Sequence, residues 1–172
     1  ESRALELLES AAARGEMLAQ SALGQMYLSG RNVPQHETTA VAFLTEAARR
    51  GESESQRELG DLFREGRGVE RDEQEAAYWY ERAAERGDAA AMAQLALLLL
   101  ESRQLFNDRI RAIELLRQSA AAGSTLAQFA LGVRLIEGMG MPRDQAQGMK
   151  LVRQSASLGN LDAQIYLREL VQ

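Results

Sequence analysis

Glycine recurs along this chain at a constant interval, at Gly15, Gly51, Gly87, Gly123 and Gly159. Two neighbouring columns keep the same step, with alanine at 12, 48, 84, 120 and 156 and leucine at 23, 59, 95, 131 and 167. A fixed period of this length without an insertion is typical of stacked-repeat proteins. Because each repeat contacts mainly its neighbours, such a chain presents an extended surface rather than an enclosed catalytic pocket.

One repeat predicts two helices, which we name A and B. Leu59, Leu62 and Phe63 follow the i, i+3, i+4 spacing of a buried helical stripe, and Gly66 suits the end of that helix. Asp72 can cap the first amides of helix B, whose inner side carries small and aromatic residues up to Gly87. The period then predicts a helix B at 3–14, A–B pairs at 18–50, 54–86, 90–122 and 126–158, and a last helix A at 161–171.

The predicted fold is therefore all-α. We expect one solenoid over 1–172, with half repeats at 1–15 and 160–172 and full repeats at 16–51, 52–87, 88–123 and 124–159. Gly60 lies inside helix A and recurs as Gly24 and Gly132, with Ala96 at the same place in repeat three. Glycine is unfavourable inside a helix, so we expect these residues to allow a close approach of helices A and B.

The second repeat resembles the Sel-one-like repeat (SLR), a relative of the tetratricopeptide repeat. The resemblance rests on Leu59 to Phe63, the loop Gly66 to Val69, Asp72, Ala76, Trp79, Tyr80, Ala83, Ala84 and Gly87. Repeat one has Asn32 for a loop glycine and His36 for the cap aspartate, and repeat three replaces the loop by Gln104, Leu105 and Phe106. The resemblance implies a right-handed superhelix that serves as an adaptor or assembly scaffold, often in bacterial envelope or secretion-linked systems.

Composition excludes several other classes of function. A net charge of −5 argues against nucleic-acid binding. Without cysteine the chain can form neither a disulfide nor a thiolate metal site, and a single histidine, His36, excludes a multi-histidine site. We expect no catalytic residue, metal or cofactor, and no membrane insertion by this segment, since its longest apolar run is only Leu95 to Leu100. Small-molecule binding or hydrolysis stays as a weak alternative. The sequence does not determine the localisation: the resemblance favours the bacterial periplasm or envelope, and the cytoplasm is possible.

A second stripe of helix A is left free by the core pattern and, by analogy with tetratricopeptide repeats, lines a concave groove. It is charged in repeat two and apolar in repeats three and four. We predict partner binding by Leu97, Leu100, Phe129, Val133 and Ile136, with orientation set by Arg57, Asp61 and Arg64. Packing between successive A helices, or cover by absent flanking sequence, would also explain the apolar half.

The partner we expect is another protein, bound as a helix or an extended peptide. The alternative is a structural spacer or oligomerisation segment of an envelope assembly. The final helix carries a further apolar surface that includes Ile165, Tyr166, Leu170 and Val171. We expect this surface to be covered by more repeats of a longer parent protein or by a partner, or to cause self-association.

Overall fold

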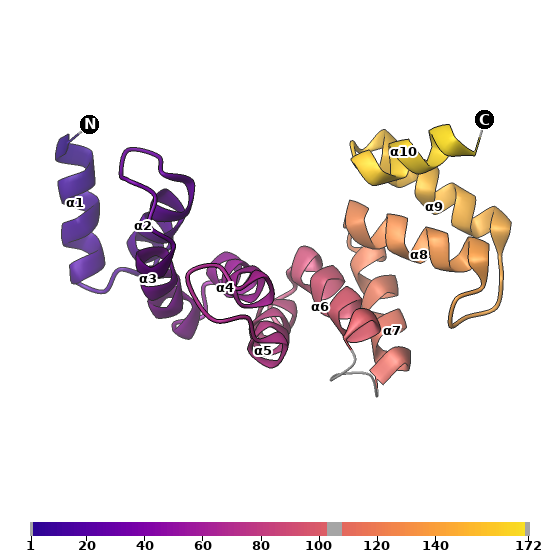
Figure 1. Cartoon of the computed structure of the whole chain (residues 1–172), viewed down its shortest axis with the longest axis horizontal. Coiled ribbons are helices and arrows are strands. Elements are labelled where there is room, and N and C mark those ends of the chain that lie inside the picture. Colours follow the sequence, from indigo (N-terminus) through magenta and orange to yellow (C-terminus); the bar gives the residue numbers. More distant parts are fainter. Residues whose placement is uncertain (1, 103–107, 171–172) are drawn as a thin grey trace. The chain divides into compact units, whose positions relative to one another are not determined.

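The computed structural model describes residues 2–102 and 108–170. Within these ranges the chain forms helices joined by short loops (Figure 1). In chain order they are α1 (Ser2–Ala13), α2 (Met17–Ser29), α3 (Glu37–Arg49), α4 (Ser53–Glu65), α5 (Glu73–Ala84), α6 (Ala89–Glu101), α7 (Arg109–Ala121), α8 (Thr125–Glu137), α9 (Gln145–Ser157) and α10 (Leu161–Glu169). The predicted all-α fold of repeated helix pairs is confirmed. The last helix ends at Glu169, and Val171, like the repeat-three loop Gln104 to Phe106, lies outside the described residues.

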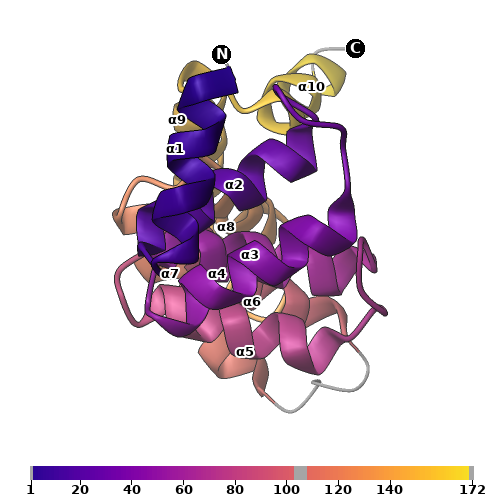
Figure 2. The ribbon, with the colours of Figure 1, turned by 90° about the vertical axis from the view of Figure 1, so that its left-hand side faces the viewer.

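The chain divides into two compact units, residues 1–88 and 89–172. In the first unit α1 lies against α2, which pairs with α3, and α4 pairs with α5 (Figures 1 and 2). In the second unit α6 pairs with α7 and α8 with α9, and α10 packs on α9. Even-numbered helices are thus the A helices of the repeat and odd-numbered helices the B helices.

Small residues allow each A helix to approach its B helix closely. A Cβ atom placed on Gly60 of α4 would lie 2.6 Å from the ring of Tyr80 in α5, and one on Gly24 would lie 2.6 Å from Leu44. In repeat four, a Cβ on Gly132 would lie 2.8 Å from Val152. A Cβ at such a distance would force the facing side chain to shift, so glycine is what lets these helix pairs pack as closely as they do.

Side-chain caps start most of the helices where the repeat predicts them. The carboxylate of Asp72 accepts hydrogen bonds from the amides of Gln74 and Glu75, and Asp144 accepts one from Gln147. His36 keeps this function in repeat one, since its Nδ1 accepts the amide of Thr39 at 3.2 Å. Asn32 adopts a positive φ of 64°, and Gly68 and Gly140, at the same place in their repeats, have φ values of 70° and 76°. Asp108 departs from the prediction, because its side chain makes no cap hydrogen bond to α7.

Within each unit the core lies between the A and B helices and continues into the next A helix of that unit. In repeat two Leu59 is fully buried and packs with Ala48 and Trp79, which is 8% exposed. Ala12, Ala19 and Leu23 form the corresponding cluster between α1 and α2. Trp79 is therefore a core residue, as its place in the repeat predicts.

Candidate functional site

The residues predicted to bind a partner lie in two different units. Leu97 and Leu100 of α6 and Phe129, Val133 and Ile136 of α8 belong to the second unit, and we call them the apolar stripe. Arg57, Asp61 and Arg64 of α4 belong to the first unit, and we call them the charged stripe.

All five side chains of the apolar stripe are half-buried, and their helices α6 and α8 are in contact. Two members also support neighbouring helices. Phe129 meets the ring of Tyr166 in α10 edge to face, with ring centroids 6.0 Å apart. Ile136 packs on α9, where a Cβ on Gly148 would lie 2.7 Å from its Cγ1. Leu97, Leu100 and Val133 are thus the members best suited to a test by substitution.

Packing between successive A helices covers part of the same helical face. Ser21 of α2 is 7% exposed and accepts a hydrogen bond from Ser55 of α4 at 3.0 Å. Ala93, at the position of Ser21 in repeat three, is fully buried. The face is therefore a row of half-buried side chains that alternate with buried contacts between repeats.

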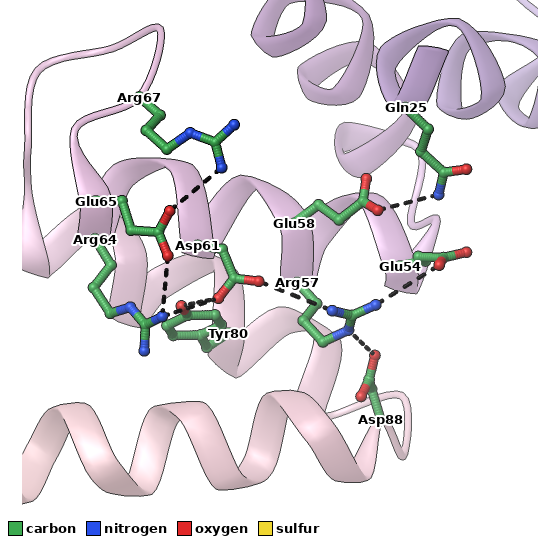
Figure 3. Close-up of polar contacts among 10 residues, drawn as sticks. All are labelled: Gln25, Glu54, Arg57, Glu58, Asp61, Arg64, Glu65, Arg67, Tyr80 and Asp88. Carbon is green, nitrogen blue, oxygen red and sulfur yellow. Dashed lines mark hydrogen bonds and ion pairs between the residues drawn. The ribbon is translucent and has the colours of Figure 1, made fainter. Parts of the chain in front are cut away.

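The charged stripe forms a network of ion pairs with its surroundings (Figure 3). The guanidinium of Arg57 lies 3.7 Å from Glu54, 3.9 Å from Asp61 and 3.4 Å from Asp88. Arg64 lies 3.7 Å from Asp61 and 3.4 Å from Glu65. These arginines are therefore already surrounded by carboxylates of their own unit.

Asp61 connects this network to the core of repeat two. The hydroxyl of Tyr80 donates a hydrogen bond to Asp61 Oδ1 at 2.6 Å (Figure 3 shows the ring beneath Asp61). Burial, followed by the bond to Asp61, raises the pKa of Tyr80 above its ordinary value. A role of Asp61 in orienting a partner would therefore be combined with a structural role.

Glu58 lies beside the charged stripe and faces α2. Gln25 donates a hydrogen bond from Nε2 to Glu58 Oε1 at 3.2 Å (Figure 3). Glu58 Oε2 is buried and has no hydrogen-bond partner among the residues that the structure describes. Burial, and then the charge of Glu54, raises the pKa of Glu58 to about 7. A groove of about 640 Å³ passes these three side chains and is also lined by Leu28, Arg31 and Arg67.

The predicted C-terminal apolar face is exposed at two of its described members. Ile165 is 50% exposed and Leu170 is 55% exposed, whereas Tyr166 is half-buried against Phe129. Leu161, at the start of α10, is 71% exposed. Exposed apolar side chains thus gather on the last helix of the second unit.

Two features of the repeat were missed by the sequence analysis although the period contains them. Gln20, Gln56, Gln128 and Gln164 share one column, and each donates its side-chain amide to the carbonyl eight residues earlier, at the end of the preceding B helix. Arg134 occupies the column held by Met26, Leu62 and Leu98, of which the two leucines are buried. Both could have been found by reading the columns for polar residues at buried positions.

Residues 2–102 and 108–170 contain no cluster of three or more histidine, cysteine, aspartate or glutamate side chains suited to a metal ion. None of the helices in those ranges has the length and apolar character needed to cross a bilayer.

Comparison with known proteins identifies relatives of this chain. The family model of the Sel1 repeat matches residues 1–16, 18–52, 53–88, 89–124 and 125–160. No curated protein matches the chain. Among solved structures, a Sel1 repeat protein from Oxalobacter formigenes is 32% identical with a TM-score of 0.86, over 94% of this chain and 66% of that one.

Two further structures are similar over most of this chain. The protective antigen c5321 of uropathogenic Escherichia coli, which displays an SLR fold, is 31% identical with a TM-score of 0.84, over 96% of this chain and 36% of that one. The immunity protein Pa5087 of Pseudomonas aeruginosa is 18% identical with a TM-score of 0.61 and shares the fold alone, over 94% of this chain and 60% of that one. This chain therefore spans no more than two thirds of the length of these relatives. The repeat match along nearly its whole length establishes that the chain belongs to the Sel1 repeat family.

Proposed function

We propose that this chain is a non-catalytic scaffold that binds a helix or an extended peptide of another protein along its apolar stripe. Sel1 repeat proteins are in general protein-interaction scaffolds rather than enzymes. The observation that carries the proposal for this chain is the apolar stripe itself, five half-buried apolar side chains on the two contacting helices α6 and α8. Apolar side chains gathered on one face commonly mark a site of protein interaction.

The energetics of such a surface favour its leucines and valine as anchors. Each of these side chains keeps an exposed part that a partner can remove from water, and burial of apolar area contributes about 25 cal/mol per Å². A few such anchors supply most of the affinity of an interface, whereas charges at its edge affect encounter and register. Arg57 and Arg64 are each already paired with carboxylates. The charged stripe can therefore orient a partner only through the net negative charge of the whole cluster.

The test is a selection from a library of random peptides displayed on phage, with the whole chain as the target. Binders should lose affinity when Leu97→Glu and Val133→Glu are introduced together, since two charges would then lie in the apolar stripe. The matched control is Ile110→Glu on α7, a residue that is 88% exposed and outside the stripe. Circular dichroism must show that the double variant keeps its helices. Binders that ignore the double variant but not the control would contradict the proposal.

A second candidate function, self-association, is favoured by the exposed end of the second unit. Ile165 of α10 and Leu170, which directly follows this helix, are each at least half exposed, as is Leu161 at its start. Sedimentation should detect association at high concentration, and Leu170→Glu should reduce it. Leu7→Glu, at a 63% exposed residue of α1, is the control. A chain that stays monomeric at every concentration would exclude this candidate.

A further inference from the structure

Arg134 breaks the pattern of its column. The same place in the repeat holds Met26, Leu62 and Leu98, and Leu62 is 2% exposed and Leu98 is 5% exposed. An arginine at a position that the repeat otherwise fills with an apolar core residue has to be stabilised by something other than the core. The residues around Arg134 therefore indicate whether this repeat has a binding function that the others lack.

Arg134 is half-buried, and its guanidinium has no direct partner in the described part of the chain. Among residues 2–102 and 108–170 it forms neither a hydrogen bond nor an ion pair, and Glu101 and Glu137 act on it only at longer range. Burial lowers the pKa of Arg134, while those two carboxylates act in the opposite direction. A partly desolvated cation of this kind is stabilised when a carboxylate reaches it directly.

A pocket of about 340 Å³ adjoins Arg134 within the second unit. Its lining comes from α6, α7, α8 and the loop that follows α8, namely Leu100, Arg109, Ile113, Arg134, Met139 and Gly140. The positive φ of Gly140, 76°, lets this loop approach α7, where a Cβ would lie 3.1 Å from Ile113. Leu100 belongs both to the pocket and to the apolar stripe, so the two surfaces are continuous.

Repeats one and two provide an internal comparison, because every position of the pocket has an equivalent 72 residues earlier. There Arg67 of the loop pairs with Glu37 at 2.7 Å, and Leu62 takes the place of Arg134. The loop lies tight on α3, since a Cβ on Gly68 would be 2.6 Å from the backbone of Glu37. In repeats three and four Glu37 is replaced by Arg109 and Arg67 by Met139, so the described lining residues include two arginines and no carboxylate.

We propose that this pocket, the Arg134 pocket, receives an acidic side chain of the peptide that lies along the apolar stripe. The carboxylate takes the place that Glu37 has in the earlier repeats, and the planar guanidinium can bind it through two parallel hydrogen bonds. Leu100, Ile113 and Met139 form the apolar part of the lining, and a bound peptide that covers them would lower the local dielectric constant and strengthen the pair. The inference rests on the proposed function and adds to it that the partner is an acidic, apolar segment, which a chain with a net charge of −5 would not otherwise be expected to attract.

The experiment uses the same peptide library on the whole wild-type chain and on Arg134→Leu, the residue that repeats two and three have in this column. Peptides selected on the wild type should combine apolar residues with a recurrent Asp or Glu, and the acid should disappear from peptides selected on the variant. A synthetic acidic peptide should bind Arg134→Leu at least about tenfold more weakly than it binds the wild type. On Arg134→Leu, the Glu→Gln version of the peptide should bind no more weakly than the acidic peptide does. Arg117→Leu, at an exposed arginine of α7, is the control.

A second variant tests the pocket without removing Arg134. Arg109→Glu with Met139→Arg restores the pair found at Glu37 and Arg67, and it should abolish the preference for acidic peptides. The proposal is overturned if acids are not enriched on the wild type, if they remain enriched on Arg134→Leu, or if the peptide's free C-terminal carboxylate alone proves to be required. Binders that respond to Val133→Glu but not to Arg134→Leu would overturn this inference and leave the proposed function standing. If no peptide binds, both are contradicted.

Discussion

Gly60 offers a direct test of how the helix pairs are built, because two effects of Gly60→Ala have opposite signs. Alanine is favoured over glycine inside a helix by about 1 kcal/mol. The added Cβ, however, would lie 2.6 Å from two ring atoms of Tyr80. Tyr80 is fully buried, and its hydroxyl is bonded to Asp61, so the ring has little freedom to move away.

We expect packing to decide the result. Overpacking of a well-filled core costs about 1–3 kcal/mol, so Gly60→Ala should lower the free energy of unfolding by about 1 kcal/mol after the gain in helix propensity. With a urea m-value of about 2 kcal/mol/M, the midpoint should fall by about 0.5 M. Trp79, the chain's single tryptophan, directly precedes Tyr80 in α5 and is only 8% exposed. Its fluorescence therefore reports unfolding of this repeat.

The matched control is the reverse change at the equivalent position of repeat three. Ala96→Gly removes a buried methyl and lowers helix propensity, so it should destabilise the chain by about 1 kcal/mol or more. If the Gly60→Ala chain were instead more stable than the wild type by about 1 kcal/mol, propensity alone would govern the position and our account of the glycine column would be wrong.

Three further predictions concern polar groups. Between pH 4.5 and about 7, folded Glu58 is protonated more often than a glutamate of the unfolded chain, so its contribution to stability is lost as the pH rises through this window. Glu58→Gln should therefore flatten the dependence of the urea midpoint on pH in this window. At pH 8 the variant should be more stable than the wild type by about 1 kcal/mol, a figure reduced for the partial exposure of the side chain. Gln128→Met, which copies Met92 of repeat three, should cost about 0.5–1.5 kcal/mol in thermal unfolding, because the carbonyl of Ala120 loses the side-chain amide and keeps only its backbone donors such as Gly123. An unchanged stability would show that the glutamine column is dispensable. His36→Asp should stabilise α3 by about 0.5–1 kcal/mol, since a carboxylate caps helix amides and suits the helix dipole; a loss of stability would mean that the imidazole contributes more than its cap bond.

The sequence alone determined the helices and most of their ends. A constant period with glycine, alanine and leucine columns fixes the spacing of the elements, and capping residues act locally, over two or three positions. For the same reason the close approach at Gly60 could be expected, because only a missing side chain explains a recurrent glycine inside a helix. Arg134 and the glutamine column could also have been recognised from the repeat period, as polar residues at positions that the repeat buries.

Only the tertiary structure decided which polar and apolar groups meet across repeats. The ion pair of Arg57 with Asp88, the contact of Phe129 with Tyr166 and the hydrogen bond from Gln25 to Glu58 join residues 31 to 37 positions apart. Such contacts depend on how far one repeat is rotated against the next, and side-chain packing sets that rotation without leaving a periodic signal. The burial that raises the pKa of Glu58, and the meeting of Arg134 with Leu100 and Ile113 around one pocket, follow from that geometry.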